Sequence, residues 1–390
     1  MIINRIIDLP SLLEKKSFFL FGPRAVGKSY AIRQQLKDRA FLIDLLNSDY
    51  YLRLSQNPGL LVSMIESAMM SGGTDGKKIE FIVIDEVQKI PALLDEVHRL
   101  IEERQWKFLL TGSSARKLKR NNANLLAGRA REARMFPLVS AEITKFDLDK
   151  YLQYGGLPSV YLSDEPEEDL QAYVQTYLRE EIQAEAAVRN LPAFSRFLEA
   201  SALTSGTLLN FTQISSDTGI PVSTVREYYF ILEDTFIGFM VEPFRKTKTR
   251  KAISTAKFYY FDLGVAHYLA KIHSLPKPSE LYGTAFEHFI GLELRAYLNY
   301  RRKLTLELCF WQEKNGKEVD FIVGDELAIE VKATERVNEK HLSGLRYLME
   351  EKVTKRHLLV SHDPIALNLN GIETLHWKDF LQKLWAGDFI

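Results

Sequence analysis

The chain has 390 residues, and its 51 Lys and Arg balance its 51 Asp and Glu, so the formal net charge is zero. A neutral chain has no overall field that draws it to nucleic acid, so any such attraction has to come from local patches. This length exceeds one ordinary core and favours two or three domains. The only cysteine, Cys309, excludes an internal disulfide and suits a reducing compartment. Because the first residues lack a signal-peptide pattern and no apolar run is long enough to cross a membrane, we expect a cytoplasmic protein with no membrane partner.

The stretch GPRAVGKS at residues 22–29 matches the pattern G-x-x-x-x-G-K-[S/T] at every fixed position. Apolar residues at 17–21 precede it and helix-forming residues at 30–36 follow it, which predicts a strand, a glycine-rich turn and a helix start. Backbone N–H groups converge on a polyphosphate in this arrangement, so a chance glycine-rich turn is disfavoured. Lys28 is expected to reach the β- and γ-phosphates of ATP, and Ser29 to bind Mg²⁺. The predicted nucleotide-binding loop consists of Gly22, Pro23, Arg24, Ala25, Val26, Gly27, Lys28 and Ser29.

A second nucleotide motif is predicted at residues 81–86, where FIVIDE forms an apolar strand that ends in two acids. After a phosphate-binding loop, Asp85 is expected to hold the water shell of Mg²⁺, and Glu86 to orient and polarise the attacking water. An isolated strand of this kind can also end in acids that cap the following helix. Its pairing with the first motif favours the nucleotide-binding role.

The next predicted strand, at 106–112, ends at Ser113 and Ser114. Between residues 116 and 134 the chain then carries seven basic residues and one acid. A solvated basic helix face is one interpretation of this segment. The other is an arginine finger, with Arg129 as the preferred candidate and Arg131 as the second, because such a residue neutralises charge on the phosphoryl group and often comes from a neighbouring subunit of a homo-oligomer. Residues 135–138 are expected to close the sheet.

The segments GPRAVGKS, FIVIDEVQKIP, FLLTGSS, LLAGR and MFPLVSAE, in this order, resemble the prokaryotic AAA-type ATPases that carry a C-terminal domain of the DUF4143 type. The resemblance implies an α/β P-loop ATPase domain with a parallel sheet over residues 1–150. It also implies that a polar residue after the strand at 106–112 senses the γ-phosphate, with Ser113 or Ser114 as the candidate. Either serine can equally cap the next helix. The biological role of these ATPases is largely uncharacterised, so the resemblance implies chemistry more readily than purpose.

A helical and winged-helix region is predicted over residues 151–275. Residues 211–229 follow a helix-turn-helix layout, and strand-like segments at 236–241 and 258–261 flank a basic loop at 245–251. The loop would then contact phosphates and the second helix would lie near a groove of DNA. Since that helix offers only Arg226 to read bases, we expect non-specific DNA binding. Many winged helices serve only as protein–protein modules, and that alternative stays open.

The last third, residues 276–390, carries a helix with Glu287, a hairpin through Asn315-Gly316, Asp320 on the second strand of that hairpin, and Glu330-x-Lys332 on the next strand. This order resembles the PD-(D/E)xK nuclease fold and implies a C-terminal α/β restriction-endonuclease-like domain. Hard Mg²⁺ needs clustered carboxylates, and Glu-x-Lys at period two points both side chains into one pocket.

Asp320, Glu330 and Glu287 would bind the metal in such a site, and Lys332 would align or activate the water. His341 is a weaker candidate to assist. The sequence departs from the usual pattern in having Val319, rather than proline, before Asp320. An amphipathic hairpin whose charges face water is the alternative interpretation.

These motifs together predict Mg²⁺-dependent ATP hydrolysis coupled to DNA binding, with metal-dependent nucleic-acid cleavage as a further activity. The alternative is an ATP-switched signalling or scaffold protein whose nuclease-like domain is catalytically inactive and holds a partner.

Overall fold

The computed structural model describes the chain except for residues 1–2, 72–77, 115–125, 127, 179–189 and 248–252. Positions 116–125 of the predicted basic segment and 248–251 of the predicted basic loop therefore lie outside the described residues. The chain forms two compact units. The first is built mainly from Met1–Phe136, and the second from Pro137 to Ile390 apart from a short part of the chain around Asp234–Phe236.

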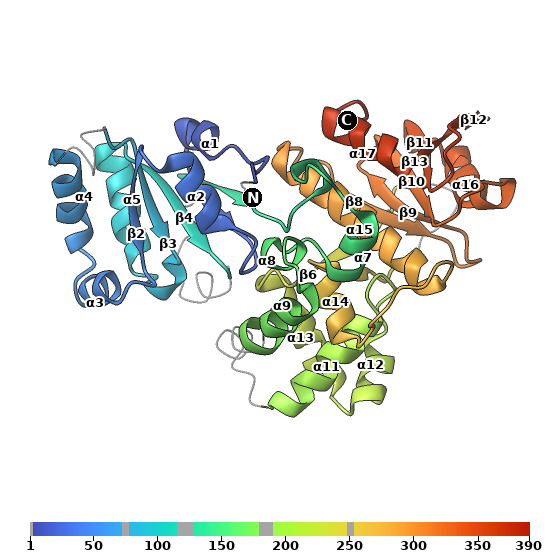
Figure 1. Cartoon of the computed structure of the whole chain (residues 1–390), viewed down its shortest axis with the longest axis horizontal. Coiled ribbons are helices and arrows are strands. Elements are labelled where there is room, and N and C mark those ends of the chain that lie inside the picture. The colour runs from blue at the N-terminus through green and yellow to red at the C-terminus, as the bar shows by residue number, and fades with distance from the viewer. Residues whose placement is uncertain (1–2, 72–77, 115–125, 127, 179–189, 248–252) are drawn as a thin grey trace. The chain divides into compact units, whose positions relative to one another are not determined.

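The first unit contains a parallel sheet in the strand order β2-β3-β4-β1-β5 (Figure 1). Inner strands β1 and β3 are buried at every residue, as expected of a parallel sheet covered on both faces. The strands are β1 Ser17–Phe21, β2 Ala40–Asp44, β3 Phe81–Asp85, β4 Lys107–Gly112 and β5 Ala130–Arg134. The helices are α1 Leu9–Lys15, α2 Lys28–Leu36, α3 Ser48–Gln56, α4 Leu60–Met70, η1 Val87–Lys89 and α5 Leu93–Arg104.

The closing strand lies five residues earlier than predicted. β5 covers Ala130–Arg134 and runs parallel to β1, with Ser17 opposite Ala130 and Phe21 opposite Arg134. The apolar run that begins at Met135 is buried but lies outside the strand. The apolar run thus led to the wrong strand position. An edge strand pairs on one side only and can carry polar side chains, so its sequence need not be apolar.

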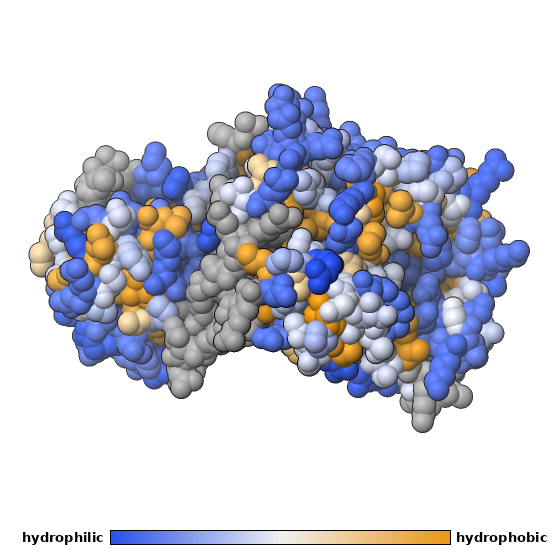
Figure 2. All heavy atoms as spheres, turned by 90° about the horizontal axis from the view of Figure 1, so that it is seen from below, coloured by the Kyte–Doolittle hydropathy of each residue, from blue (hydrophilic) through white to orange (hydrophobic). Residues whose placement is uncertain are grey.

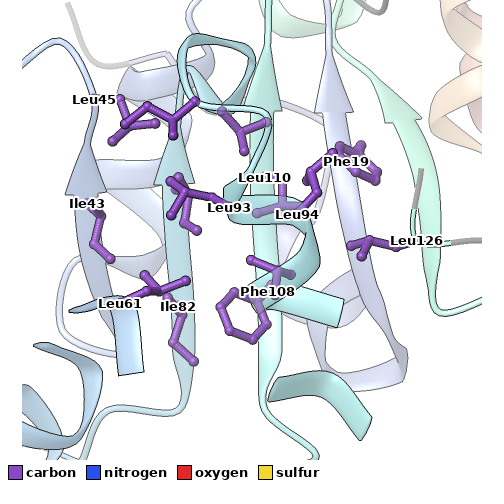
Figure 3. Close-up of a cluster of buried hydrophobic side chains, with 14 of the residues drawn as sticks. Phe19, Ile43, Leu45, Leu61, Ile82, Leu93, Leu94, Phe108, Leu110 and Leu126 are labelled. Atoms are coloured by element: carbon purple, nitrogen blue, oxygen red, sulfur yellow. The ribbon is translucent and has the colours of Figure 1, made fainter. Parts of the chain in front are cut away.

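One side of this sheet packs against helices to form the core drawn in Figure 3. The labelled side chains include Phe19, Ile43, Ile82 and Phe108 from four strands and Leu93 from α5. Full burial of such a side chain stabilises the fold by roughly 1.5–3 kcal/mol relative to exposure. The packing therefore fixes the strands whose carboxyl ends carry the nucleotide motifs.

The second unit is built around an eight-stranded mixed sheet in the order β12-β13-β11-β10-β9-β8-β6-β7. Its strands are β6 Gly238–Pro243, β7 Lys257–Tyr260, β8 Leu308–Gln312, β9 Glu318–Val323, β10 Leu327–Lys332, β11 Arg356–Ser361, β12 Leu367–Leu369 and β13 Ile372–His376. Its helices are η2 Ser140–Glu142, α7 Leu148–Tyr154, α8 Pro158–Tyr161, α9 Pro166–Ala172, η3 Tyr173–Leu178, α11 Leu191–Leu203, α12 Phe211–Thr218, α13 Val222–Asp234, α14 Leu263–Leu269, α15 Glu280–Tyr300, η4 Glu339–Leu342, α16 Ser343–Glu351 and α17 Trp377–Ala386.

The expected boundary near residue 275 falls within this unit. β6 and β7 form an antiparallel hairpin, and β6 also pairs in parallel with β8 at Glu242–Cys309 and Pro243–Phe310. The two strands that flank the predicted basic loop at 245–251 are thereby continuous with the sheet that carries the C-terminal motif. The three-part division of the chain stays a prediction, since the two later parts share a sheet.

Two short helices form the predicted helix-turn-helix. α12 ends at Gly219, which has a left-handed backbone (φ 68°) that favours glycine, and α13 follows after two residues. Arg226 on α13 lies with its guanidinium carbon 4.8 Å from the centre of the Phe211 ring. Val225, Tyr229 and Leu232 face the interior, so the helix has one buried and one exposed side.

Apolar and polar side chains are mixed on the face drawn in Figure 2, where apolar areas are interspersed with hydrophilic residues. Scattered exposed apolar side chains such as Met70 and Phe230 are ordinary features of folded domains. Among the helices of the described residues, none is both long and apolar enough to cross a membrane.

A buried carboxylate, Glu293 on α15, ties three helical elements of the second unit together. It accepts hydrogen bonds from the Ser140 N–H (2.6 Å), the Ser140 hydroxyl (3.0 Å) and the Trp385 indole N–H (2.7 Å). Burial raises the pKa of Glu293 to about 7, against the opposing effect of those donors. The folded chain therefore holds this proton over a pH range in which the unfolded chain has released it.

Ionisation of Glu293 should make stability fall as pH rises. The carboxyl group of Glu293 releases its proton near pH 4.5 in the unfolded chain and near pH 7 in the folded chain. Its contribution to stability is therefore complete below about pH 4.5 and is lost by about pH 7, a change of about 3 kcal/mol. We expect the free energy of unfolding of wild type, relative to that of Glu293→Gln, to fall across this window in urea titrations. Glu339→Gln, at an exposed ion pair, is the matched control: it keeps Glu293, so its stability should fall with pH in parallel with that of wild type. Parallel pH profiles for wild type and Glu293→Gln would contradict the assignment.

Candidate nucleotide and carboxylate sites

The loop between β1 and α2 has the backbone that its sequence requires. Gly27 is the N-cap of α2 in a left-handed conformation (φ 93°). A Cβ on Gly22 would lie 2.4 Å from the carbonyl oxygen of Met135, so only glycine fits there. The buried guanidinium of Arg5 donates to the carbonyl oxygens of Val26 and Phe136. The loop is thus held from the N-terminal segment as well as from the sheet.

Ser29 and Asp85 meet at the carboxyl end of the sheet. The Ser29 hydroxyl donates to Asp85 Oδ2 at 2.7 Å, and Asp85 is buried. Thr111 on the intervening strand β4 donates to the other oxygen, Asp85 Oδ1. A buried carboxylate beside a loop hydroxyl is the donor set that Mg²⁺ takes together with phosphate oxygens. The residues present therefore fit a Mg²⁺-nucleotide.

Glu86 follows Asp85 in a left-handed conformation (φ 61°) that is uncommon for a residue with a side chain. Its backbone N–H donates to the Thr111 hydroxyl at 3.0 Å, and its carboxylate accepts a hydrogen bond from the Gln88 amide. The same Gln88 nitrogen lies 3.2 Å from the Ser113 hydroxyl. Gln88 and Thr111 thus connect Glu86, Asp85 and Ser113. A Gln and a Thr near strand ends are common in sequences, so the sequence alone does not mark Gln88 and Thr111 as residues of the site.

Lys28 lies back across the loop in this structure. Its ammonium donates to the carbonyl oxygens of Gly22 (2.7 Å) and Pro23 (2.8 Å), and the residue is buried. The ammonium group of Lys28 therefore lies at the loop where the phosphates of the nucleotide are expected.

Arg129 lies far from this loop within its own chain. It immediately precedes Ala130, which stands opposite Ser17, the first residue of β1, whereas the loop follows Phe21 at the other end of that strand. Four residues of strand correspond to roughly 13 Å. Arg129 instead contacts Glu102 at 2.5 Å. Its role as an arginine finger therefore stays a prediction that requires a neighbouring subunit. Arg131 is exposed and lies opposite Phe18, so it is no better placed to serve the loop of its own chain.

The second unit brings Asp320, Glu330 and Lys332 together on β9 and β10. Lys332 Nζ lies 2.7 Å from Glu330 Oε1 and 3.8 Å from Asp320 Oδ2. The backbone N–H of Val331 donates to Asp320 Oδ2 at 2.7 Å. Asp320 and Glu330 are buried, and Glu330 Oε2 has no hydrogen-bond partner within the described residues. The period of two along β10 thus places Glu330 and Lys332 on one face, as the sequence predicts.

Glu287 has other partners. Its Oε1 accepts from the Tyr259 hydroxyl at 2.7 Å and lies 3.2 Å from Lys257 Nζ. Both partners come from β7, which corresponds to the strand predicted at 258–261 beside the basic loop. Among the described residues, no three His, Cys, Asp or Glu side chains are grouped closely enough to hold a metal ion. Asp320, Glu330 and Glu287 as they stand therefore do not form a three-carboxylate ligand set.

Burial and mutual repulsion set the electrostatics of this cluster. Burial raises the pKa of Asp320, and the charge of Glu287 adds to it. Burial, together with the charge of Asp320, raises the pKa of Glu330 well above its usual value. Burial, the largest single effect, lowers the pKa of Lys257, but the charges of Glu287, Asp320 and Glu318 and the hydrogen bond to Glu287 together outweigh it, and the pKa rises. The nearby carboxylates thus stabilise the charged form of Lys257.

His341 caps a turn in this region. Its Nδ1 accepts from the backbone N–H of Asn338 at 3.2 Å, at the start of η4. Burial, and then the charge of Lys332, lower the pKa of His341. The residue has a local structural role, and among the contacts of the described residues none joins it to Asp320 or Glu330.

The parallel sheet and the loop of the first unit fit the class of P-loop domains, and one family model agrees with this class. Residues 14–144 match a family described as an AAA domain. Residues 145–275 match a domain of unknown function, DUF8612, and residues 282–377 match a domain of unknown function, DUF4143. The chain carries an AAA domain and, towards its C-terminus, a DUF4143 domain. That part of the resemblance is confirmed, whereas the nuclease-like fold of the last domain stays a prediction.

Two relatives are similar over most of their length. An uncharacterized protein of Haemophilus influenzae is 25% identical over 327 residues, which are 78% of this chain and 78% of the relative. An uncharacterized protein of Methanocaldococcus jannaschii is 22% identical over 357 residues, 83% of this chain and 75% of the relative. Among solved structures, domain III of the Thermotoga maritima replication initiation protein DnaA matches at 14% identity over 56% of this chain and 84% of that chain. Its TM-score of 0.20 is too low to define a shared fold.

Proposed function

We propose that the chain is a Mg²⁺-dependent ATP hydrolase. The observation that carries the proposal is the contact of Ser29 with Asp85 beside a Glu86 that is held by Gln88. Ser29 and Asp85 would hold Mg²⁺, which when bound neutralises charge on the phosphates. Lys28 adds a positive charge at the same loop, and Glu86 orients water for attack. Phosphate release from ATP that requires Mg²⁺ is the expected result, and tight ATP binding without release would contradict hydrolysis.

We further propose that the nucleotide cycle is coupled to non-specific DNA binding by the second unit. Support comes from the helix-turn-helix of α12 and α13 and from exposed cations on and near it, Arg226, Arg245 and Lys246. Arg245 is 69% exposed, and its nearest acid in an ion pair, Glu242, lies 4.0 Å away. Cations in such positions neutralise phosphates and release counterions.

DNA binding is tested with a labelled duplex of arbitrary sequence in fluorescence anisotropy, with and without ATP, over a series of salt concentrations. We expect affinity that falls steeply with salt, changes with ATP and drops in Arg245→Ala/Lys246→Ala. Lys355→Ala, at an exposed ion pair elsewhere on the same unit, is the matched control. No binding even at low salt, together with a stable protein complex, would favour a signalling or scaffold role.

The second unit is better supported as an inactive nuclease-like domain than as a nuclease. The element order α15-β8-β9-β10-α16-β11, with Asp320 and Glu330 on adjacent strands, supports the nuclease-like fold. A specific observation disfavours cleavage: Glu287, one of the three expected metal ligands, already pairs with the buried Lys257. Incubation with plasmid DNA and Mg²⁺ or Mn²⁺, with and without ATP, should therefore leave the plasmid intact. Cleavage that disappears in Lys332→Ala would overturn this assignment.

A further inference from the structure

Lys257 places a positive charge inside the carboxylate cluster of the second unit. Its side chain is only 7% exposed, and its Nζ lies 3.2 Å from Glu287 Oε1. The ring of Phe310 lies 5.3 Å from the same ammonium. A buried ammonium with an aromatic neighbour and little contact with water needs a permanent counter-charge. Glu287 is that counter-charge.

Glu287 is fixed in this role by a second contact. The Tyr259 hydroxyl donates to the same oxygen, Oε1, at 2.7 Å. Lys257 and Tyr259 are two apart on β7, so both side chains project from the same face of that strand. β7 therefore presents an ammonium and a hydroxyl to one carboxylate, and holds that carboxylate on the β7 side of the cluster.

The remaining carboxylates are held from the other side. Lys332 contacts Glu330 and lies within 3.8 Å of Asp320. Three carboxylates, Glu287, Asp320 and Glu330, thus share the cluster with two ammonium groups, those of Lys257 and Lys332. A divalent ion added here would be repelled by both ammonium groups, and would find only Asp320 and Glu330 available to bind it.

We propose that Lys257 takes the place of a divalent cation in this cluster and keeps it free of metal. The proposal rests on the nuclease-like fold assigned to the second unit, and it goes beyond that fold by naming the residue that sets metal occupancy. Loss of the Lys257 charge should release Glu287 to join Asp320 and Glu330 as a hard-oxygen ligand set for Mg²⁺ or Mn²⁺.

The test measures the binding of Mn²⁺ alone to the full-length protein without nucleotide. Binding is monitored through the decrease of the electron paramagnetic resonance signal of free Mn²⁺. Because nucleotide is omitted, no ATP phosphates are present to bind Mn²⁺ at the P-loop, and the result does not depend on ATP hydrolysis. Wild type is expected to show no Mn²⁺ site that Asp320→Asn removes. Lys257→Met, of similar length but neutral, is expected to gain one Mn²⁺ site that binds at least about tenfold more tightly than any residual Mn²⁺ binding by wild type. That site should disappear again in Lys257→Met/Asp320→Asn.

Lys355→Met is the matched control, because it removes the same charge from an exposed ion pair of the same unit. It should leave Mn²⁺ binding as in wild type. Lys257→Gln keeps a donor for Glu287 and serves if Lys257→Met fails to fold. A wild-type site that Asp320→Asn abolishes overturns the proposal, and so does a folded Lys257 variant that gains no site. If neither variant folds, the wild-type measurement decides alone: absence of a site supports the proposal and its presence refutes it.

Discussion

Glu86→Gln should bind ATP about as well as wild type but hydrolyse it at least about 100-fold more slowly. The carboxylate of Glu86 is held by the Gln88 amide next to Asp85, and its backbone is fixed through Thr111. The amide of a glutamine keeps the shape but cannot accept a proton from water or polarise it as a carboxylate does. Since Glu86 makes no contact with Lys28 or Ser29 among the described interactions, nucleotide affinity should be preserved.

Two measurements separate the steps. Calorimetric titration with ATP and Mg²⁺ reports binding, and phosphate release reports hydrolysis. Glu103→Gln, on the exposed side of α5, should match wild type in both, because it removes a carboxylate of the same unit at a surface ion pair. If Glu86→Gln released phosphate at the wild-type rate, Glu86 would not be the residue that orients water.

The nucleotide site could be predicted because its information is local. Eight consecutive residues, 22–29, define the loop between β1 and α2 together with the start of α2, and Asp85 and Glu86 follow directly on an apolar strand. Contact between Ser29 and Asp85 then follows from a parallel sheet, in which all carboxyl ends lie at one edge. Gln88 and Thr111 could not be singled out, since their role depends on what their side chains meet across strands.

Non-local pairing explains what the sequence did not predict in the second unit. The period of two on β10 places Glu330 beside Lys332, which is a local property. The contact of Lys257 with Glu287 joins a strand near residue 257 to a helix 30 residues later, and no spacing rule connects them. Parallel pairing of β6 with β8 likewise joins segments separated by more than 60 residues, so the sheet could not be assembled from short patterns. The position of β5 was mispredicted for a related reason: β5 is defined by its pairing with β1, and its polar sequence gives little apolar signal.

Lys28→Ala should lose at least about 100-fold in affinity for ATP with Mg²⁺, or about 3 kcal/mol. Two effects add. The variant removes the positive charge that the phosphates meet, and it leaves the carbonyl oxygens of Gly22 and Pro23 without the donor that now holds the loop. Lys28→Arg is also expected to lose affinity, because a planar guanidinium does not fit the position of a compact, buried ammonium.

Calorimetric titration again gives the measurement, with circular dichroism to confirm that the variant is folded. Lys37→Ala, at the exposed C-terminal end of α2, removes a lysine from the same helix and should bind ATP as wild type does. The comparison with Lys28→Arg separates charge from fit: retention of most affinity there would show that a positive charge suffices and that the compact shape of the ammonium is not required. If wild type gave no heat with ATP and Mg²⁺, and Lys28→Ala behaved identically, the loop would not be a nucleotide site. Asp85 would then be a buried acid at the end of β3, and Glu86 a half-buried acid after it, without a phosphate to act on.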